Sequence, residues 1–177
     1  MELTVMYPET FTEPTAEERS IIDRFHDLYY RAWLNGRGTK DILWFGRHMW
    51  KCPLDLWIYQ EILFELRPDV IIECGPHNGG SALYLASICQ MLGTGRVISI
   101  DIAERENRPE HPLITYLLGS STDEHITSIV KDFCQGKTVM AILDSDHSQA
   151  HVAREMEIYA NLVTKDQYMI VEDTNIN

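Results

Sequence analysis

The segment from Val70 to Ser81 constrains the fold of this chain more than any other. Residues 70–73 (VIIE) have the pattern of a buried strand and lead directly into the turn 74–81 (CGPHNGGS), which a helical pattern follows. Glycine permits a positive φ and leaves no Cβ in the way of a ligand, and a helix N-terminus offers unpaired N–H groups. A strand that ends on an acid before such a turn is typical of α/β folds that bind a ribosyl ligand.

The spacing of the glycines indicates which ligand this turn suits. A diphosphate usually meets the pattern G-x-G-x-x-G, whereas here Glu73 is followed by Gly75 and then by the run Gly79-Gly80-Ser81. The turn is also expected to lack a nearby Lys or Arg for a phosphate group. These features favour a ligand with ribose hydroxyls and a zwitterionic tail, and S-adenosylmethionine fits that description.

Composition excludes some other classes of protein. A chain of 177 residues suffices for one domain with a layered core, and its net charge of −12 argues against nucleic acid as a partner. The four cysteines stand singly, which predicts reduced thiols. No apolar run reaches the roughly 20 residues that span a bilayer, and the first residues do not resemble a signal peptide, so we expect a cytoplasmic protein.

The chain divides into an N-terminal extension and a regular domain. Residues 1–52 are predicted to hold an extended arm, a helix that Thr15 caps and that ends near Leu34, and an irregular aromatic stretch. Residues 53–177 begin with a helix at Pro53. Strands at 70–73, 96–101, 114–118, 138–143 and 167–172 then alternate with helices at 80–92, 122–134 and 148–163. This alternation predicts a mostly parallel sheet with helices on both faces.

Two later strand ends would complete a nucleoside site. Asp101 ends the second strand, where an acid accepts hydrogen bonds from both ribose hydroxyls; the alternative is an Asp that caps the following loop. Ser120 and Ser121 follow the third strand and would lie beside the adenine. The predicted cofactor site is therefore formed by loops at the carboxyl edge of the sheet.

The last two strands deliver acidic clusters to the same edge. Asp144 and Asp146 follow the fourth strand, and Glu172 and Asp173 follow the fifth. Four carboxylates repel one another unless a cation neutralises them or some are protonated, and an all-oxygen set suits Mg²⁺, Mn²⁺ or Ca²⁺; the alternative is a solvated acidic rim. His147 is predicted to be a general base rather than a structural residue.

Several stretches in order resemble the cephalosporin hydroxylase/rhamnosyl O-methyltransferase family. They are residues 51–61 (KCPLDLWIYQE), 68–75 (PDVIIECG) with the following Gly79-Gly80-Ser81, 143–148 (LDSDHS) and 171–175 (VEDTN), and the resemblance covers about residues 40–177. It implies a Rossmann-like class I methyltransferase fold that uses S-adenosylmethionine and Mg²⁺. Such a sheet normally continues with antiparallel strands, which we expect to be missing because the sequence stops at Asn177.

The resemblance also implies a role for each candidate residue. It places Glu73 and the turn from Gly75 to Ser81 beside the methionine part of the cofactor and Asp101 at the ribose. With the serines after the third strand and the first acid after the fourth, the predicted cofactor contacts are Glu73, Gly75, His77, Gly79, Gly80, Ser81, Asp101, Ser120, Ser121 and Asp144. The implied metal ligands are Asp144, Glu172 and Asp173, and Asp146 is the alternative to Asp144. The implied base is His147. His77 stands where the general methyltransferase turn has its middle glycine.

The predicted activity is methyl transfer to a hydroxyl of a small molecule, a sugar or another natural product. The first alternative is a glycosyltransferase, because Asp144-Ser145-Asp146 has the D-x-D pattern. The second is a non-catalytic cofactor-binding protein. The aromatic-rich residues 29–59 would cover the active site or bury against another subunit, so a homo-oligomer is a further expectation.

Overall fold

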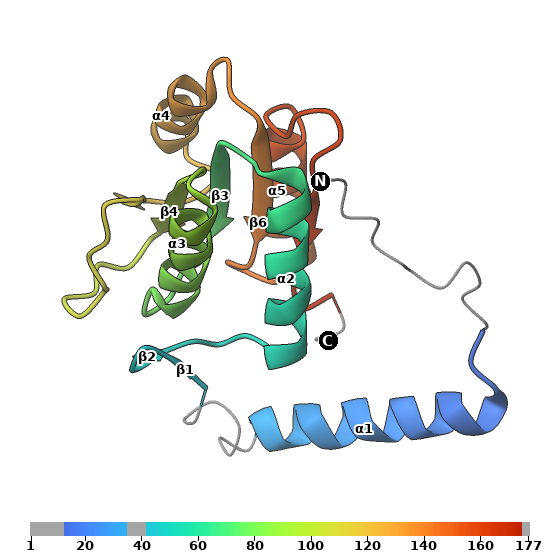
Figure 1. Ribbon diagram of the computed structural model, residues 1–177. Coiled ribbons are helices and arrows are strands. Elements are labelled where there is room, and N and C mark those ends of the chain that lie inside the picture. The colour runs from blue at the N-terminus through green and yellow to red at the C-terminus, as the bar shows by residue number, and fades with distance from the viewer. Residues whose placement is uncertain (1–12, 35–41, 175–177) are drawn as a thin grey trace, which may run out of the picture. The chain divides into compact units, whose positions relative to one another are not determined.

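A computed structural model describes residues 13–34 and 42–174 (Figure 1). It divides into two compact units, Met1–Lys40 and Asp41–Asn177. The first contains helix α1 (Ala16–Leu34), and Thr15 caps it as predicted. The backbone N–H and the hydroxyl of Thr15 both donate to Glu18 at 2.8 Å, and the N–H of Glu18 donates back at 3.3 Å. Most of the predicted N-terminal arm lies outside the described residues.

The second unit is built on a parallel sheet. Its strands are β3 (Val70–Cys74), β4 (Val97–Asp101), β5 (Ile114–Leu118), β6 (Val139–Leu143) and β7 (Met169–Val171). They run in the order β5-β4-β3-β6-β7, and every neighbouring pair is parallel. The predicted α/β fold with a mostly parallel sheet is confirmed.

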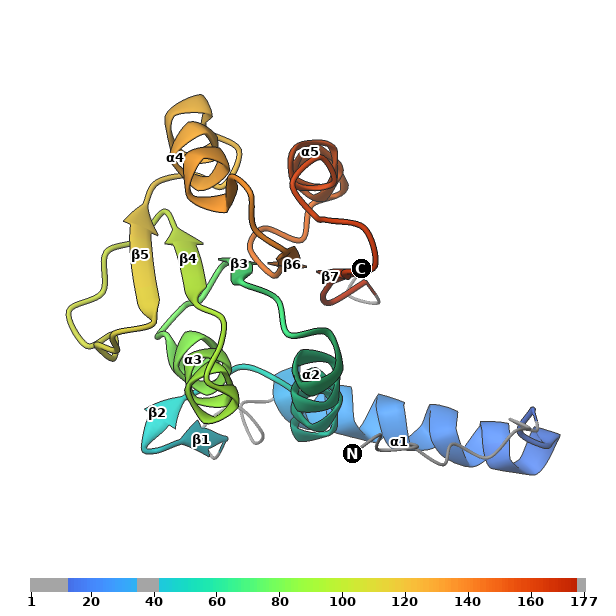
Figure 2. The ribbon, with the colours of Figure 1, turned by 45° about the horizontal axis from the view of Figure 1, so that its top comes forward.

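Helices cover both faces of this sheet (Figure 2). Helices α2 (Pro53–Leu66) and α3 (Gly80–Leu92) lie on one face, and α4 (Glu124–Cys134) and α5 (Gln149–Tyr159) lie on the other. Side chains alternate along each strand, so Ile71 packs with the α2/α3 layer while Val70 and Ile72 pack with the α4/α5 layer. Burial on both sides explains why these strands are continuous apolar runs.

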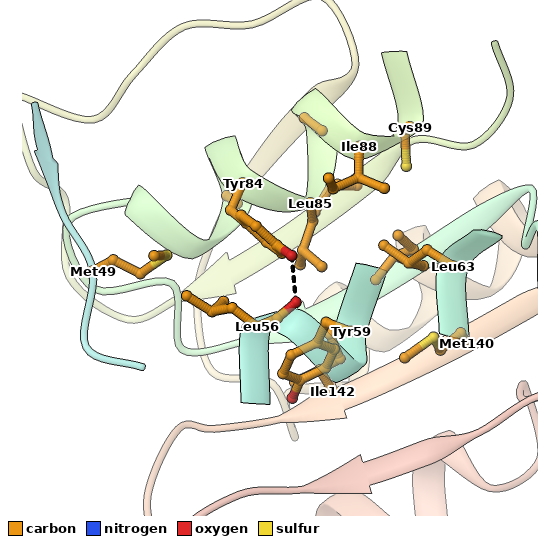
Figure 3. Packing of buried hydrophobic residues seen from close by; sticks show 14 residues of the cluster. Met49, Leu56, Tyr59, Leu63, Tyr84, Leu85, Ile88, Cys89, Met140 and Ile142 are labelled. Carbon is orange, nitrogen blue, oxygen red and sulfur yellow. Dashed lines mark hydrogen bonds between the residues drawn. The ribbon is translucent and has the colours of Figure 1, made fainter. Parts of the chain in front are cut away.

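Helices α2 and α3 pack against each other and against the sheet through buried side chains. Leu56, Tyr59 and Leu63 of α2, which repeat at helical spacing, are buried. Tyr84 of α3 donates its hydroxyl hydrogen bond to the carbonyl of Leu56, which ties the two helices together (Figure 3). Tyr59 lies on the same buried face of α2, against the sheet.

The aromatic stretch before α2 is more regular than predicted. It contains a short antiparallel hairpin, β1 (Leu43–Trp44) and β2 (Arg47–His48). Its turn residues have φ of 46° and 76°, and the Trp44 indole packs edge-on against Tyr84 with ring centroids 4.9 Å apart. The hairpin therefore belongs to the same compact unit as the sheet, whereas the sequence analysis placed a boundary between residues 52 and 53.

Three predicted elements differ from those observed by more than one residue at an end. Helix α4 starts two residues later than predicted, because the side chain of Asp123 accepts a hydrogen bond from the His125 N–H and caps it there. Helix α5 ends at Tyr159 rather than at 163, and β7 has only three residues. Among the described residues, none of the helices combines the length and apolar character needed to cross a membrane.

Candidate active site at the carboxyl edge of the sheet

The turn after β3 is held in very close contact with the loop after β6. Gly75 has φ +86°, and a Cβ at this position would overlap the backbone carbonyl oxygen of Asp144. Gly79 has φ +77°, and a Cβ there would lie 2.6 Å from the Tyr116 hydroxyl oxygen. Only glycine meets both the backbone and the packing requirement at these two positions. The glycines predicted to serve a ligand thus also bring two loops of the site together.

His77 stands in this turn with φ +47°, in the left-handed region. A glycine would adopt this conformation at no steric cost, which accounts for the glycine that the general methyltransferase turn has there. The imidazole stacks on the indole of Trp50, with ring centroids 4.4 Å apart and planes 23° apart. Trp50 is half exposed, so the segment before α2 contacts the predicted cofactor turn.

Glu73 lies beneath the turn rather than on an open surface. Its side chain is buried, and the Ser99 hydroxyl donates a hydrogen bond to it. Burial raises the pKa of the Glu73 carboxyl, and hydrogen bonds from Ser81 and Ser99 only partly offset this effect. The carboxyl group is therefore positioned to support the turn from inside the fold.

Asp101 ends β4 with both carboxylate oxygens engaged. One oxygen accepts the N–H of Ala103 at 2.9 Å, and the other pairs with Arg108. Arg108 also donates to the carbonyl of His77 at 2.9 Å. The prediction that no Lys or Arg lies near the glycine turn is wrong. Arg108 reaches the turn from the loop between β4 and β5, and Asp101 balances its charge.

The two serines after β5 have different surroundings. Ser120 lies in a local turn, where its hydroxyl is 3.0 Å from that of Thr122. Ser121 is buried, and its hydroxyl donates to Glu155 of α5. Both residues lie at the carboxyl edge of the sheet, as predicted. Ser120 is only partly buried, whereas Ser121 is buried.

Lys51 joins the two acidic clusters. Its ammonium nitrogen lies 2.6 Å from one oxygen of Asp144 and 2.7 Å from one oxygen of Glu172, and the side chain is buried. Tyr59 of α2 donates a further hydrogen bond to Glu172. The sequence predicts that repulsion among these carboxylates is relieved either by the positive charge of a cation or by protonation of some of them. Lys51 supplies part of that charge from within the chain.

Burial and charge oppose each other in this ion pair. Burial alone lowers the pKa of the Lys51 ammonium, but the carboxylates of Asp144 and Glu172 outweigh it, so the pKa is raised. Burial raises the pKa of Asp144 to about 7; Lys51 lowers it, while Glu172 and Asp173 raise it further. The site thus holds more negative charge than Lys51 neutralises.

Asp144 also forms, with two other side chains, a group of the right size for a metal ion. One ligand atom each from Asp144, His147 and Asp173 lie within 4.8 Å of one another. The His147 Nε2 atom is 3.4 Å from Asp173 Oδ2 and 4.0 Å from Asp144 Oδ1. Lys51 contacts the opposite oxygen of Asp144, Oδ2, so Oδ1 faces this group. Two carboxylates and an imidazole suit a divalent cation.

The remaining predicted ligands lie differently. Asp146 is exposed, and its carboxylate accepts the N–H of Ser148 at 2.7 Å, at the start of α5. Glu172 is engaged by Lys51 and Tyr59 through one oxygen. The structure therefore brings Asp144, His147 and Asp173 together and keeps Glu172 adjacent through Lys51. It leaves Asp146 exposed in the loop before α5.

The residues that sequence reasoning missed are Lys51, Tyr59 and Arg108. Lys51 and Tyr59 lie in the stretch 51–61 that carried the family resemblance, so a signal existed, although no role was assigned to either residue. Arg108 lies in a loop with no recognisable pattern. It becomes part of the site only through the fold.

A five-stranded parallel sheet in this order, with a glycine turn after the central strand and an acid after the next, defines a class I methyltransferase fold. Comparison with known proteins narrows the class. The chain belongs to the Rhamnosyl O-methyltransferase/CmcI family, whose model matches residues 37–177.

Individual relatives agree with this assignment. Rhamnosyl O-methyltransferase of Mycobacterium tuberculosis H37Rv is 36% identical over 165 residues, which are 89% of this chain and 65% of the relative. The Mycobacterium leprae protein of the same name is 37% identical over 164 residues, with 89% and 69% covered. A CmcI structure with SAH aligns with a TM-score of 0.59 at 25% identity, covering 94% of this chain and 82% of that one. The chain thus spans about two thirds of the length of its curated relatives.

Proposed function

We propose that this chain carries the cofactor and metal sites of an S-adenosylmethionine-dependent O-methyltransferase that acts on a hydroxyl of a sugar. One observation carries the proposal. The ion-sized group of Asp144, His147 and Asp173 adjoins the glycine turn so closely that Gly75 has no room for a Cβ against the Asp144 backbone. A methyl donor bound at the turn would thus lie beside a hydroxyl bound at the acidic group.

Each part of the edge has a role in this scheme. The turn from Gly75 to Ser81 and Asp101 would hold the methionine and ribose parts of the cofactor. Asp144 and Asp173, with the second oxygen of Glu172, would hold Mg²⁺, which when bound lowers the pKa of a nearby hydroxyl. His147 would accept the hydroxyl proton at Nε2. Alignment of the oxygen with the methyl group would supply much of the acceleration.

The family supports the acceptor class. The curated relatives are named rhamnosyl O-methyltransferases, and the CmcI structure contains SAH, the demethylated cofactor. We therefore propose a sugar, and a rhamnoside first, as the small-molecule acceptor.

The glycosyltransferase alternative is weakened by the position of Asp146. A D-x-D site uses both acids around one metal ion, yet only Asp144 belongs to the ion-sized group, while the Asp146 carboxylate is exposed and accepts the N–H of Ser148. A non-catalytic protein is the other alternative. It would retain cofactor binding without methyl transfer.

One experiment separates these functions. Calorimetric titration of the chain with S-adenosylhomocysteine, a UDP-sugar and MgCl₂ is followed by an assay of radiolabelled methyl transfer to a rhamnoside. We expect binding of S-adenosylhomocysteine and Mg²⁺, methyl transfer that stops in EDTA, and recovery when Mg²⁺ is restored. Full turnover in chelator, with no metal detected in the protein, would refute the metal role. Binding of the UDP-sugar alone would favour the glycosyltransferase.

Replacing Asp101 with alanine tests the ribose contact. The loss of a charged hydrogen-bond acceptor should weaken S-adenosylhomocysteine binding by about 1.5–3 kcal/mol, measured by calorimetry. Asp132 on α4 is exposed, and Asp132→Ala is the matched control, with unchanged affinity expected. Wild-type affinity in Asp101→Ala would remove this residue from the cofactor site.

A further inference from the structure

A second buried polar cluster lies on the α5 face of the same edge. Glu155 of α5 is fully buried, and its Oε1 atom accepts hydrogen bonds from the hydroxyls of Ser121 and of Ser145, the latter at 2.7 Å. His151, one helical turn earlier, has Nε2 3.4 Å from the same Oε1 and 3.1 Å from the Ser121 hydroxyl. A buried carboxylate is costly unless it is hydrogen-bonded, so this cluster requires an explanation.

The cluster is not arranged as a nucleophilic triad. In a triad, the acid orients the histidine through one ring nitrogen while the serine contacts the other. Here Glu155 and Ser121 both face the Nε2 atom of His151, and Ser121 itself is buried. The cluster is therefore arranged to hold residues in position rather than to cleave a bond.

The two loops that Glu155 links follow strands that are not neighbours in the sheet. Ser121 follows β5 and Ser145 follows β6 directly after Asp144, yet β4 and β3 lie between those two strands in the sheet. One carboxylate oxygen thus links two loops across the ends of two intervening strands. Tyr159, also on α5, donates to the backbone carbonyl of Ser121 at 2.7 Å and secures the first loop a second time.

The link also passes next to the start of the glycine turn. Burial raises the pKa of the Cys74 thiol well above its ordinary value, and the charge of the neighbouring Glu155 raises it further. Cys74 is the last residue of β3 and precedes Gly75. The second oxygen of Glu155 is buried and has no hydrogen-bond partner within the described part of the chain. A buried carboxylate oxygen without a partner is energetically costly.

We propose that Glu155 is a positioning residue for the cofactor, because it fixes the loop of Ser121 relative to the loop of Ser145 and so sets the width of the space for the adenine. This inference rests on the proposed function, which places the adenine beside Ser120 and Ser121. Glu155 itself contacts no ligand in this arrangement and acts through the two serine hydroxyls.

Binding of S-adenosylhomocysteine measured by calorimetry tests the inference without requiring an acceptor or turnover. Glu155→Leu removes both hydrogen bonds and should raise the Kd roughly 10- to 50-fold. Glu155→Gln keeps an acceptor oxygen for the hydroxyls and should stay within about threefold of wild type. An equal loss in both variants would overturn the hydrogen-bonding role.

A matched control separates positioning from general destabilisation. Val139 is buried in the same layer but begins β6, at the opposite end of the strand from Asp144. Val139→Ala should lower the melting temperature without changing the Kd. Hydrogen exchange in Glu155→Leu should increase in the loops 119–122 and 144–148. Unchanged exchange there, with wild-type affinity, would refute the inference.

Ser145→Ala keeps the test valid if Glu155→Leu does not fold. It removes one of the two donors and should raise the Kd roughly two- to tenfold. In the double variant with Glu155→Leu, the loss should equal that of Glu155→Leu alone, because both changes act through one interaction. Additive losses would overturn the proposal. If the wild-type chain failed to bind S-adenosylhomocysteine, the proposed function would fail, whatever Glu155 does.

Discussion

Replacing His147 with alanine is expected to lower kcat by about 10²–10⁴-fold, the usual contribution of a general base. The ring is about one-third exposed, with 34% of the side chain accessible, and its Nε2 atom lies 3.4 Å from Asp173 Oδ2. An acceptor hydroxyl held at this group would thus meet an imidazole able to take its proton. Single-turnover methyl transfer at saturating cofactor measures the effect, and higher pH should partly restore the rate of the variant.

Metal affinity decides whether His147 is a base or a ligand, since it is one of the three members of the ion-sized group. A base can be removed with little change in Mg²⁺ affinity, whereas the loss of a ligand weakens it. We expect calorimetry to give unchanged Mg²⁺ and cofactor affinity in His147→Ala. His125 on α4 is exposed, and His125→Ala is the control for both measurements. A wild-type kcat in His147→Ala, with chemistry rate-limiting, would require another base.

Replacing Lys51 with methionine should destabilise the metal-free protein by about 3–5 kcal/mol, the range for removal of one partner from a buried ion pair. Asp144 and Glu172 would each lose their cationic partner, which lies within 2.7 Å of both. Urea unfolding at pH 8 in chelator measures the loss. Lys165 is almost fully exposed, so Lys165→Met is the control. A loss below about 1 kcal/mol would show that Lys51 contributes little.

The stability loss in Lys51→Met should depend on pH with a definite sign. Burial raises the pKa of Asp144 to about 7 in the folded protein, above the value of about 3.9 expected in the unfolded chain. The folded state therefore binds the proton more tightly, and the stability from this carboxyl is fully present near pH 4 and lost as pH rises through 7. Without Lys51, protonation of Asp144 relieves the unpaired charge. The loss should thus be smaller at pH 5 than at pH 8, and Asp144→Asn should reduce the difference.

Local patterns sufficed to predict the sheet and the residues that lie at its carboxyl edge. Residues such as Ile71 and Ile72 lie in strands buried on both faces, which makes the pattern continuous and apolar. The glycine turn has its own chemistry, because Gly75 and Gly79 need positive φ. Helix ends are harder to predict from local patterns, because several neighbouring residues can serve as the N-cap, as Asp123 does for α4.

The contacts that complete the site could not be predicted in the same way. Lys51 pairs with Asp144 and Glu172, and Arg108 with the turn of His77, across separations that no local period encodes. The hairpin before α2 was missed because its strands have two residues each, too few for an alternating pattern to be recognised. The sequence gives no sign that Glu155 differs from an ordinary exposed acid on a helix, and its burial becomes evident only in the fold.

The order of the strands has a consequence for how the protein folds. Strands β3, β4 and β5 follow one another along the chain and pair as neighbours, so the half of the edge with the glycine turn and Asp101 forms through comparatively local contacts. Val70 pairs with Val139 only after a long segment has closed, and closure of long loops slows folding. The half of the edge with the glycine turn and Asp101 should therefore assemble before the half with Asp144, and Asp144 should pair with Lys51 only in the last stage of folding.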